Sequence, residues 1–344
     1  MTAPADAPDT AWLTTLAQAL AGRGLLATAE GVRFERLTGG VSSDIWALHG
    51  RNTVLVVKRA LAQLRVAQVW RAPVTRNAAE AAWLDTVHAI APDFAPAVLY
   101  HDAAAGLFVM PYIPPATAPV WKAELLAGRC DVAFAAEVGR RVGAIHAATA
   151  GRADIAARFA NAEAFHELRI APYLLATAER HPALASRLGE LAAASAAARD
   201  CLIHGDVSPK NILMGPRGPI LLDAECATCG DAAFDLAFCL NHLLLKAVRV
   251  ADPAPLRRAF DALAEAYFAA AAFAPRETLE ARAAALLPGL FLARVDGKSP
   301  VEYITTDAER ARVRAVATHF LLTPTDRLGA IYARWEAILK DIAP

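Results

Sequence analysis

The chain has 344 residues, of which 56% are hydrophobic, so it can form a substantial buried core. Its 35 lysine and arginine residues balance its 35 aspartate and glutamate residues, which excludes a strong overall attraction to nucleic acid or to an anionic membrane. The first ten residues lack the pattern of a signal peptide, and apolar runs such as residues 284–293 are shorter than the roughly 18 residues that span a bilayer. We therefore expect a cytoplasmic monomer or homodimer with no nucleic-acid or membrane partner.

The five cysteines are scattered, and their odd number is typical of reduced thiols rather than of a disulfide framework. Cys226 and Cys229 form a CxxC pair. A zinc site would need a second pair or nearby histidines, which the adjoining sequence lacks. We therefore predict no metal at this pair.

The first third of the chain predicts a helix followed by a small antiparallel sheet. Short apolar or alternating runs are separated by glycine-containing turns, which is typical of strands. We expect a helix over about residues 9–21, strands over 32–37, 45–48 and 54–57, a helix over 78–90, and strands over 97–101 and 107–110.

The turn between the first two predicted strands has the composition of a phosphate-binding loop. Glycines allow the backbone to approach phosphate oxygens, and serine hydroxyls and N–H groups can donate to them. The candidate residues are Gly39, Gly40, Ser42 and Ser43. An ordinary hairpin turn has a similar composition, so the stronger evidence for a nucleotide site comes from Lys58 and Glu80.

Lys58 ends the third predicted strand, and Glu80 lies early in the helix that follows. A strand lysine that pairs with a helix glutamate and contacts the α- and β-phosphates of ATP is an arrangement that kinases require. Further along, Met110, Pro111 and Ile113 occupy the place where adenine would bind, through the carbonyl of Pro111 and the N–H of Ile113. These residues predict an ATP site.

The proline-rich run over residues 111–119 predicts a linker, and from Trp121 onward the composition becomes rich in alanine and leucine. We expect an N-terminal nucleotide-binding lobe over residues 1–110, a hinge over 111–119 and a helical catalytic and substrate-binding lobe over 120–344. Helical periodicity predicts helices over 132–148, 162–178, 184–198, 231–248, 255–272 and 310–321, interrupted at 201–222 by two β-type runs that flank a polar loop.

That polar loop carries the clearest chemistry. The run from His204 to Asn211 reads HGDVSPKN, and after another apolar run come Asp223 and Glu225. Phosphoryl transfer needs a carboxylate that orients the attacking hydroxyl and accepts its proton, a role for Asp206. Asn211, Asp223 and Glu225 offer hard oxygen ligands suited to Mg²⁺.

Two other features are not assigned to catalysis. Gly297-Lys298-Ser299 looks like the end of a P-loop, but Leu292 stands where that motif needs glycine. Lys298 could still line a substrate pocket. His146 and His242 lie on apolar helical segments, where histidines are usually buried in the core or support a catalytic residue.

The chain resembles the aminoglycoside phosphotransferase and choline kinase superfamily over about residues 34–241, most specifically in HGDVSPKN, LLDAE and GDAAFDLAF. The resemblance implies an α+β, bilobal protein-kinase-like fold with ATP and Mg²⁺ as cofactors. It also implies Asp206 as catalytic base, and Asn211, Asp223 and Glu225 as metal ligands. The run VKRAL at residues 57–61, with Arg65 and Trp70, is most similar to the methylthioribose kinase branch.

These observations indicate a small-molecule kinase whose acceptor is a sugar, such as a methylthioribose-like pentose, or an amino alcohol. A protein kinase needs a longer segment between Asp223 and the next helix and a basic residue in place of Gly205. An aminoglycoside phosphotransferase remains an alternative, although residues 230–344 hold 14 basic and 14 acidic residues and no acidic excess for a polycation. A nucleotide-binding protein without catalysis is the alternative of another class.

Overall fold

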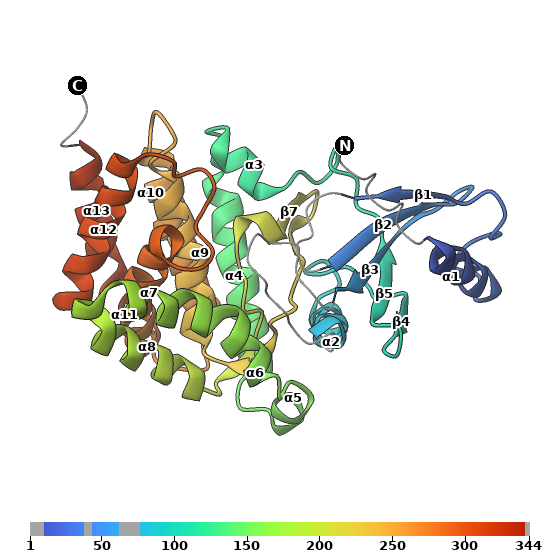
Figure 1. Ribbon diagram of the computed structural model, residues 1–344, viewed down its shortest axis with the longest axis horizontal. Coiled ribbons are helices and arrows are strands. Elements are labelled where there is room, and N and C mark those ends of the chain that lie inside the picture. The colour runs from blue at the N-terminus through green and yellow to red at the C-terminus, as the bar shows by residue number, and fades with distance from the viewer. Residues whose placement is uncertain (1–9, 38–42, 62–75, 341–344) are drawn as a thin grey trace, which may run out of the picture. The chain divides into compact units, whose positions relative to one another are not determined.

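The computed structural model describes residues 10–37, 43–61 and 76–340 (Figure 1). The chain divides into two compact units, one made of residues 1–81 and 97–113 and the other of 82–96 and 114–344. The first contains an antiparallel sheet and the second is largely helical, so the predicted α+β class is confirmed. Among the described helices, none combines the length and the apolar composition that crossing a bilayer would require.

The first unit is built on a five-stranded sheet in the order β1-β2-β3-β5-β4, with all neighbours antiparallel. Leu13, Leu16 and Leu20 of the first helix form one apolar cluster with residues of the sheet that include Leu55 and Val57. The elements are α1 (Ala11–Gly22), β1 (Arg33–Arg36), β2 (Ser43–His49), β3 (Val54–Ala60), the first residues, 76–81, of α2 (Arg76–Ile90), β4 (Tyr100–Asp102) and β5 (Leu107–Pro111).

The two-residue period of a strand explains which face of β3 carries Lys58. Because Leu55 and Val57 belong to the cluster with α1, Val56 and Lys58 must point to the opposite face of the sheet. The lysine is thereby turned away from the apolar cluster and toward the helix that supplies its partner, Glu80.

The second unit surrounds a central helix, α9, of which every residue is buried. Its neighbour α4 approaches α10 so closely that a Cβ atom added at Gly139 would lie 2.0 Å from the carbonyl oxygen of Leu263. The helices are α3 (Trp121–Leu126), α4 (Val132–Thr149), α5 (Ala153–Arg158), α6 (Ala162–Phe165), η1 (His166–Leu175), α7 (Ala176–Arg180), α8 (Ala185–Ala197), α9 (Ala232–Lys246), α10 (Ala254–Ala270), α11 (Arg276–Asp296), α12 (Asp307–Leu322) and α13 (Leu328–Lys340).

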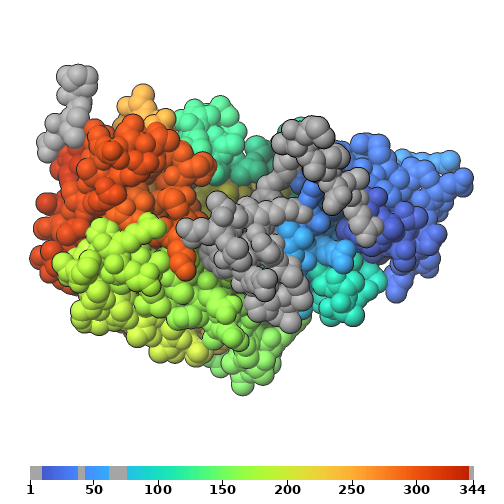
Figure 2. Space-filling model, viewed as in Figure 1, coloured from blue at the N-terminus to red at the C-terminus, as the bar shows by residue number. Residues whose placement is uncertain are grey.

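Two small antiparallel pairs of strands interrupt the helices of this unit. β6 (Cys201–Ile203) pairs with β9 (Thr228–Gly230), and β7 (Ile212–Gly215) pairs with β8 (Gly218–Leu221). These strands carry the predicted catalytic loop. Figure 2 shows that segments near residue 180 and near residue 300 form much of the visible face of this unit. They are in contact, because Arg180 donates to the carbonyl oxygen of Asp296 over 2.8 Å.

The helix predicted over residues 162–178 forms in a different way than expected. Its middle, η1, is a π-helix that contains Pro172, and a widened turn accommodates a residue that has no N–H to donate. α11 and α13 were not predicted. α11 contains Pro288 and Gly289, which usually end helices, but Gly289 lets the side chain of Leu174 approach closely. All five cysteines are free thiols.

Candidate active site

The predicted catalytic loop begins at the end of β6, and hydrogen bonds between its own residues hold it in shape. The side chain of Asp206 is almost fully buried. The amide nitrogen of Asn211 donates to the carboxylate oxygen Oδ2 of Asp206 over 2.9 Å and to its backbone carbonyl over 3.1 Å. The structure therefore brings the proposed base and one proposed metal ligand into direct contact.

The loop that carries Asp223 is tied to this catalytic loop by hydrogen bonds. Nε2 of His204 donates to the carbonyl oxygen of Leu222 over 3.0 Å, while Nδ1 accepts from the N–H of Asp206 over 3.2 Å. The N–H of Leu222 donates to the carbonyl oxygen of Asn211 over 2.9 Å. Burial lowers the pKa of His204, which keeps the ring neutral in the one tautomer that can make both bonds. His204 thus links the two loops.

Asp223 has a backbone φ of 68° and is the only non-glycine residue with a positive φ in the described part of the chain. Aspartate and asparagine tolerate this left-handed conformation better than most residues do. The turn places Asp223 where its charge acts on both Asp206 and Lys210. Such a strained conformation is typical of functional sites.

Asp235, on α9, was seen in the sequence only as part of a helical pattern, but it is a central positioning residue. Its two carboxylate oxygens accept from the N–H groups of His204 and Gly205 over 2.7 and 2.8 Å, and Oδ2 lies 3.3 Å from Nε2 of His146. The side chain is fully buried. It fixes the backbone immediately before Asp206. The one feature of the sequence that could have identified Asp235 is its position in the run GDAAFDLAF.

Two cations contact Asp206, and neither was predicted from the sequence. Arg169 of η1 approaches the oxygen Oδ2 of Asp206 to 2.9 Å, and Lys210 approaches the same oxygen to 3.0 Å. Arg169 also donates to the carbonyl oxygen of Gly205 over 2.7 Å. Burial raises the pKa of Asp206, but Arg169 and Lys210 outweigh burial and bring the pKa below its usual value. No sequence signal marked Arg169, because it lies far from the motif in a helical segment.

The oxygens near Asp206 are suited to a Mg²⁺ ion that arrives with a nucleotide. Because Asn211 donates its amide nitrogen to Asp206, its amide oxygen points away and can serve as a ligand. Asp223 offers a carboxylate, and Glu225 is buried nearby, where its charge acts on Arg169. Within residues 10–37, 43–61 and 76–340, no three His, Cys, Asp or Glu side chains form a metal-binding group. A few hard oxygens without such a cage are typical of magnesium sites completed by phosphate.

The first unit contains the predicted lysine and glutamate as a buried ion pair. Nζ of Lys58 lies 2.9 Å from Oε1 and 2.7 Å from Oε2 of Glu80, and both side chains are almost inaccessible to solvent. Asn77 supports the arrangement by donating to the carbonyl oxygen of Lys58 over 3.2 Å. A buried cation fixed in this way is oriented in advance for a phosphate.

The predicted adenine-binding segment lies at the end of β5. The N–H of Tyr112 donates to the carbonyl oxygen of Val54 on β3. The backbone N–H and C=O groups of successive residues point to alternate sides of a strand. The carbonyl of Pro111 and the N–H of Ile113 therefore point away from β3. Met110 precedes them, paired with Val56. The role of these groups toward adenine stays a prediction.

Some predicted residues lie outside the described part of the chain. Gly39, Gly40 and Ser42 of the proposed phosphate loop belong to residues 38–42, and Arg65 and Trp70 of the methylthioribose kinase resemblance belong to residues 62–75. Ser43 is described and is the buried first residue of β2.

Gly205 is expected to be irreplaceable for both steric and conformational reasons. Its φ is +76°, and an added Cβ atom would lie 2.9 Å from Cβ of Cys226. We expect Gly205→Ala to lower the free energy of unfolding by about 2–4 kcal/mol and to reduce turnover. Gly128→Ala is a matched control, because Gly128 also has φ +76° but no atom within 4 Å of the added Cβ. Urea denaturation of both variants tests this expectation. Equal losses would mean that the contact with Cys226 does not matter.

The fold and these residues define a class of protein, the phosphotransferases that act on small molecules. Residues 33–286 match the model of the phosphotransferase enzyme family, APH. This match spans most of the chain, and the chain belongs to that family. A search of curated protein sequences finds no significant match.

Solved structures with the same fold are distant in sequence. A choline/ethanolamine kinase family protein from Mesorhizobium loti is 18% identical with a TM-score of 0.52, and the alignment covers 95% of this chain and 98% of that chain. An amicoumacin kinase solved with AMP-PNP, Ca²⁺ and Ami is 12% identical with a TM-score of 0.58, over 87% of this chain and 91% of that chain. An ethanolamine kinase from Plasmodium vivax is 9% identical with a TM-score of 0.53, over 97% and 89%. At these identities the likeness shows the fold alone.

Proposed function

We propose that this enzyme transfers the γ-phosphate of ATP to a hydroxyl group of a small metabolite, with Asp206 as the catalytic base. The observation that carries this proposal is the asymmetry of the Asp206 carboxylate. Asn211, Arg169 and Lys210 all make their nearest contact with Oδ2, and none of the hydrogen bonds found among the described residues ends on Oδ1. Oδ1 is the oxygen that can accept the acceptor's hydroxyl proton.

The three contacts to Oδ2 fix the carboxylate and keep it ionised at neutral pH, because its pKa is below the usual value. An oriented carboxylate accelerates proton transfer from a hydroxyl by roughly 10²- to 10⁴-fold. Lys58 would bind the α- and β-phosphates, and the segment from Met110 to Ile113 would bind adenine. Asn211 and Asp223, with Glu225 directly or through water, would hold Mg²⁺, which neutralises the phosphate charge during transfer.

Replacement of Asp223 tests the magnesium assignment. Asp223→Asn keeps the shape of the side chain and tolerates the left-handed backbone, but it removes the charge. We expect the dissociation constant for ATP in the presence of Mg²⁺ to rise at least about tenfold, with binding of metal-free ATP nearly unchanged. Titration calorimetry measures both. Asp326→Asn, at an exposed carboxylate, is the control, and an unchanged affinity in Asp223→Asn would refute the assignment.

The proposed function itself is tested by ADP formation from Mg²⁺-ATP with a panel of acceptors. The panel holds sugars, including methylthioribose, amino alcohols, aminoglycosides, hydroxy acids and sugar phosphates. We expect one class to stimulate ADP formation and to be recovered as a phosphate ester. ATP binding with no stimulation by any acceptor would favour a nucleotide-binding role without catalysis.

A further inference from the structure

The second unit contains a buried lysine that pairs with no carboxylate of the described residues. Lys246, on α9, is 1% exposed to solvent. The one hydrogen bond found for its ammonium group is a long one, 3.4 Å, to the carbonyl oxygen of His242 in the same helix. No carboxylate of the described residues forms a salt bridge with it. Burying an ammonium group without a carboxylate partner costs free energy of folding. The residues around Lys246 therefore indicate what role it has.

The surroundings of Lys246 are basic. We call Lys122, His242, Lys246 and Arg294 the basic cluster; they come from α3, α9 and α11. Burial, with Lys122 and Arg294 acting in the same direction and Cys239 and Glu302 opposing, lowers the pKa of Lys246 to about 7. Burial also lowers the pKa of His242 far below its usual value, and Lys246, Arg294, Lys210 and Lys122 act in the same direction.

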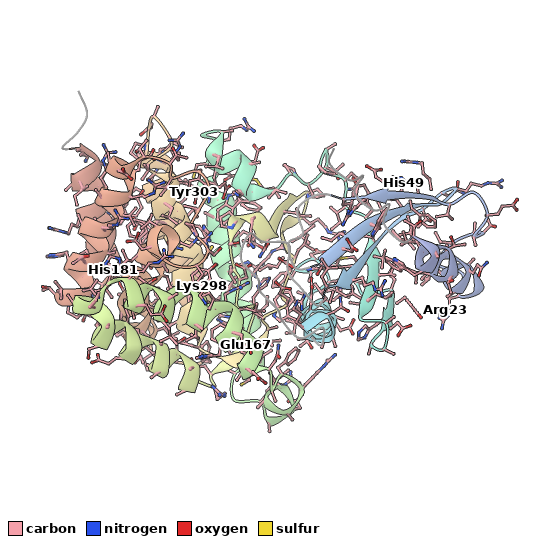
Figure 3. All side chains as sticks on the ribbon, viewed as in Figure 1. Arg23, His49, Glu167, His181, Lys298 and Tyr303 are labelled. Atoms are coloured by element: carbon pink, nitrogen blue, oxygen red, sulfur yellow. The ribbon has the colours of Figure 1, made fainter. Side chains whose placement is uncertain are left out.

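Hydrogen-bond donors in this region also lack acceptors. Nε of Arg294 and the hydroxyl of Tyr303 are buried, and neither has a hydrogen-bond partner in the described structure. The ring of Tyr303 lies 5.2 Å from Nζ of Lys246 and 5.9 Å from Nζ of Lys122. Figure 3 marks Tyr303 within the helical unit. Cations and unsatisfied donors in one place are what an anion-binding site requires.

The basic cluster is connected to the catalytic loop. Nη1 of Arg294 donates to the hydroxyl of Tyr173 over 2.9 Å, and Tyr173 interacts electrostatically with Arg169 and Lys210, the two cations on Asp206. Lys210 in turn acts on His242. Tyr173 therefore connects the basic cluster to the cations that contact Asp206.

Building on the proposed function, we propose that the acceptor carries an anionic group, a carboxylate or a phosphate, which binds the basic cluster while its hydroxyl faces Asp206. Glu302 shows that a carboxylate can bind to this cluster. Its carboxylate forms an ion pair with Lys122, although its side chain is 68% exposed. The anion of the acceptor would displace this carboxylate. The proposal favours a hydroxy acid or a sugar phosphate over an amino alcohol or an aminoglycoside.

The test measures binding of simple anions to the whole protein at saturating Mg²⁺ and AMP-PNP. Malonate and inorganic phosphate are titrated separately at low ionic strength by calorimetry, so that the two arms distinguish a carboxylate site from a phosphate site. We expect one of them to bind, Lys246→Met to weaken that binding roughly ten- to hundredfold, and Glu302→Gln to strengthen it. Met keeps the length of the buried side chain, so Lys246→Met should fold.

Lys340→Met, which removes an exposed lysine on α13, is the control and should leave anion affinity unchanged. The inference is overturned if neither anion binds the wild type, if Lys246→Met binds them as the wild type does, or if choline or kanamycin binds more tightly than both anions. Failure of AMP-PNP to bind would instead count against the proposed function. In that case the same titrations without nucleotide still show whether the basic cluster binds an anion.

Discussion

Asp206→Asn is expected to lower kcat by about 10³-fold or more while the affinity for Mg²⁺-ATP changes only a few-fold. The substitution keeps the shape of the side chain but removes the carboxylate that accepts the hydroxyl proton. The nucleotide does not depend on this proton transfer, so binding and turnover should separate. Steady-state kinetics and nucleotide titration on the same preparation measure both quantities.

The outcome depends on the variant remaining folded, because Arg169 loses its partner. Circular dichroism and the retained nucleotide affinity provide that control. Turnover within a few-fold of the wild type would contradict the role of Asp206 as base. Parallel losses of nucleotide affinity and turnover would show that Asp206 acts on the nucleotide instead.

The second large effect is expected at Asp235. Asp235→Ala should lower the free energy of unfolding by about 3–5 kcal/mol, because it leaves the buried N–H groups of His204 and Gly205 without acceptors. Turnover should fall as well, since these two residues set the backbone of Asp206. Chemical denaturation measures the loss of stability.

Asp261→Ala is a suitable control for this variant. Asp261 lies on α10, is about half exposed and pairs with Arg257 one turn away, so its removal should cost less than about 1 kcal/mol. Asp235→Asn retains one acceptor oxygen and should recover part of the lost stability. A loss at Asp235→Ala as small as that at Asp261→Ala would contradict the positioning role.

The elements that could be predicted from the sequence are those whose signal is local. The strand that carries Lys58 and the loop from His204 to Asn211 combine β-type runs with polar residues at fixed spacing. Both form, although the strand continues to Ala60. α11 was not predicted, because proline and glycine, here Pro288 and Gly289, usually mark the ends of helices. In the structure both lie inside the helix, where Gly289 packs against Leu174. Tertiary packing overrides local propensity there.

The same distinction applies to the site. Asp206 and Asn211 stand in the motif HGDVSPKN and Asp223 stands in LLDAE, so residue type and spacing were sufficient to select them. Arg169 contacts Asp206 through a π-helix more than thirty residues earlier, a contact that no pattern within either segment encodes. Asp235 was visible only as a helical residue, because its role depends on the direction in which α9 presents it to the catalytic loop.

The most direct test of the central claim is a crystal structure of the protein with AMP-PNP and Mg²⁺. We predict a Mg²⁺ ion about 2.1 Å from the amide oxygen of Asn211 and from a carboxylate oxygen of Asp223, bridging to the phosphates. Oδ1 of Asp206 should face the γ-phosphate without binding the metal. Phosphates bound away from Asp223, or a metal ion bound by Asp206 itself, would contradict the account.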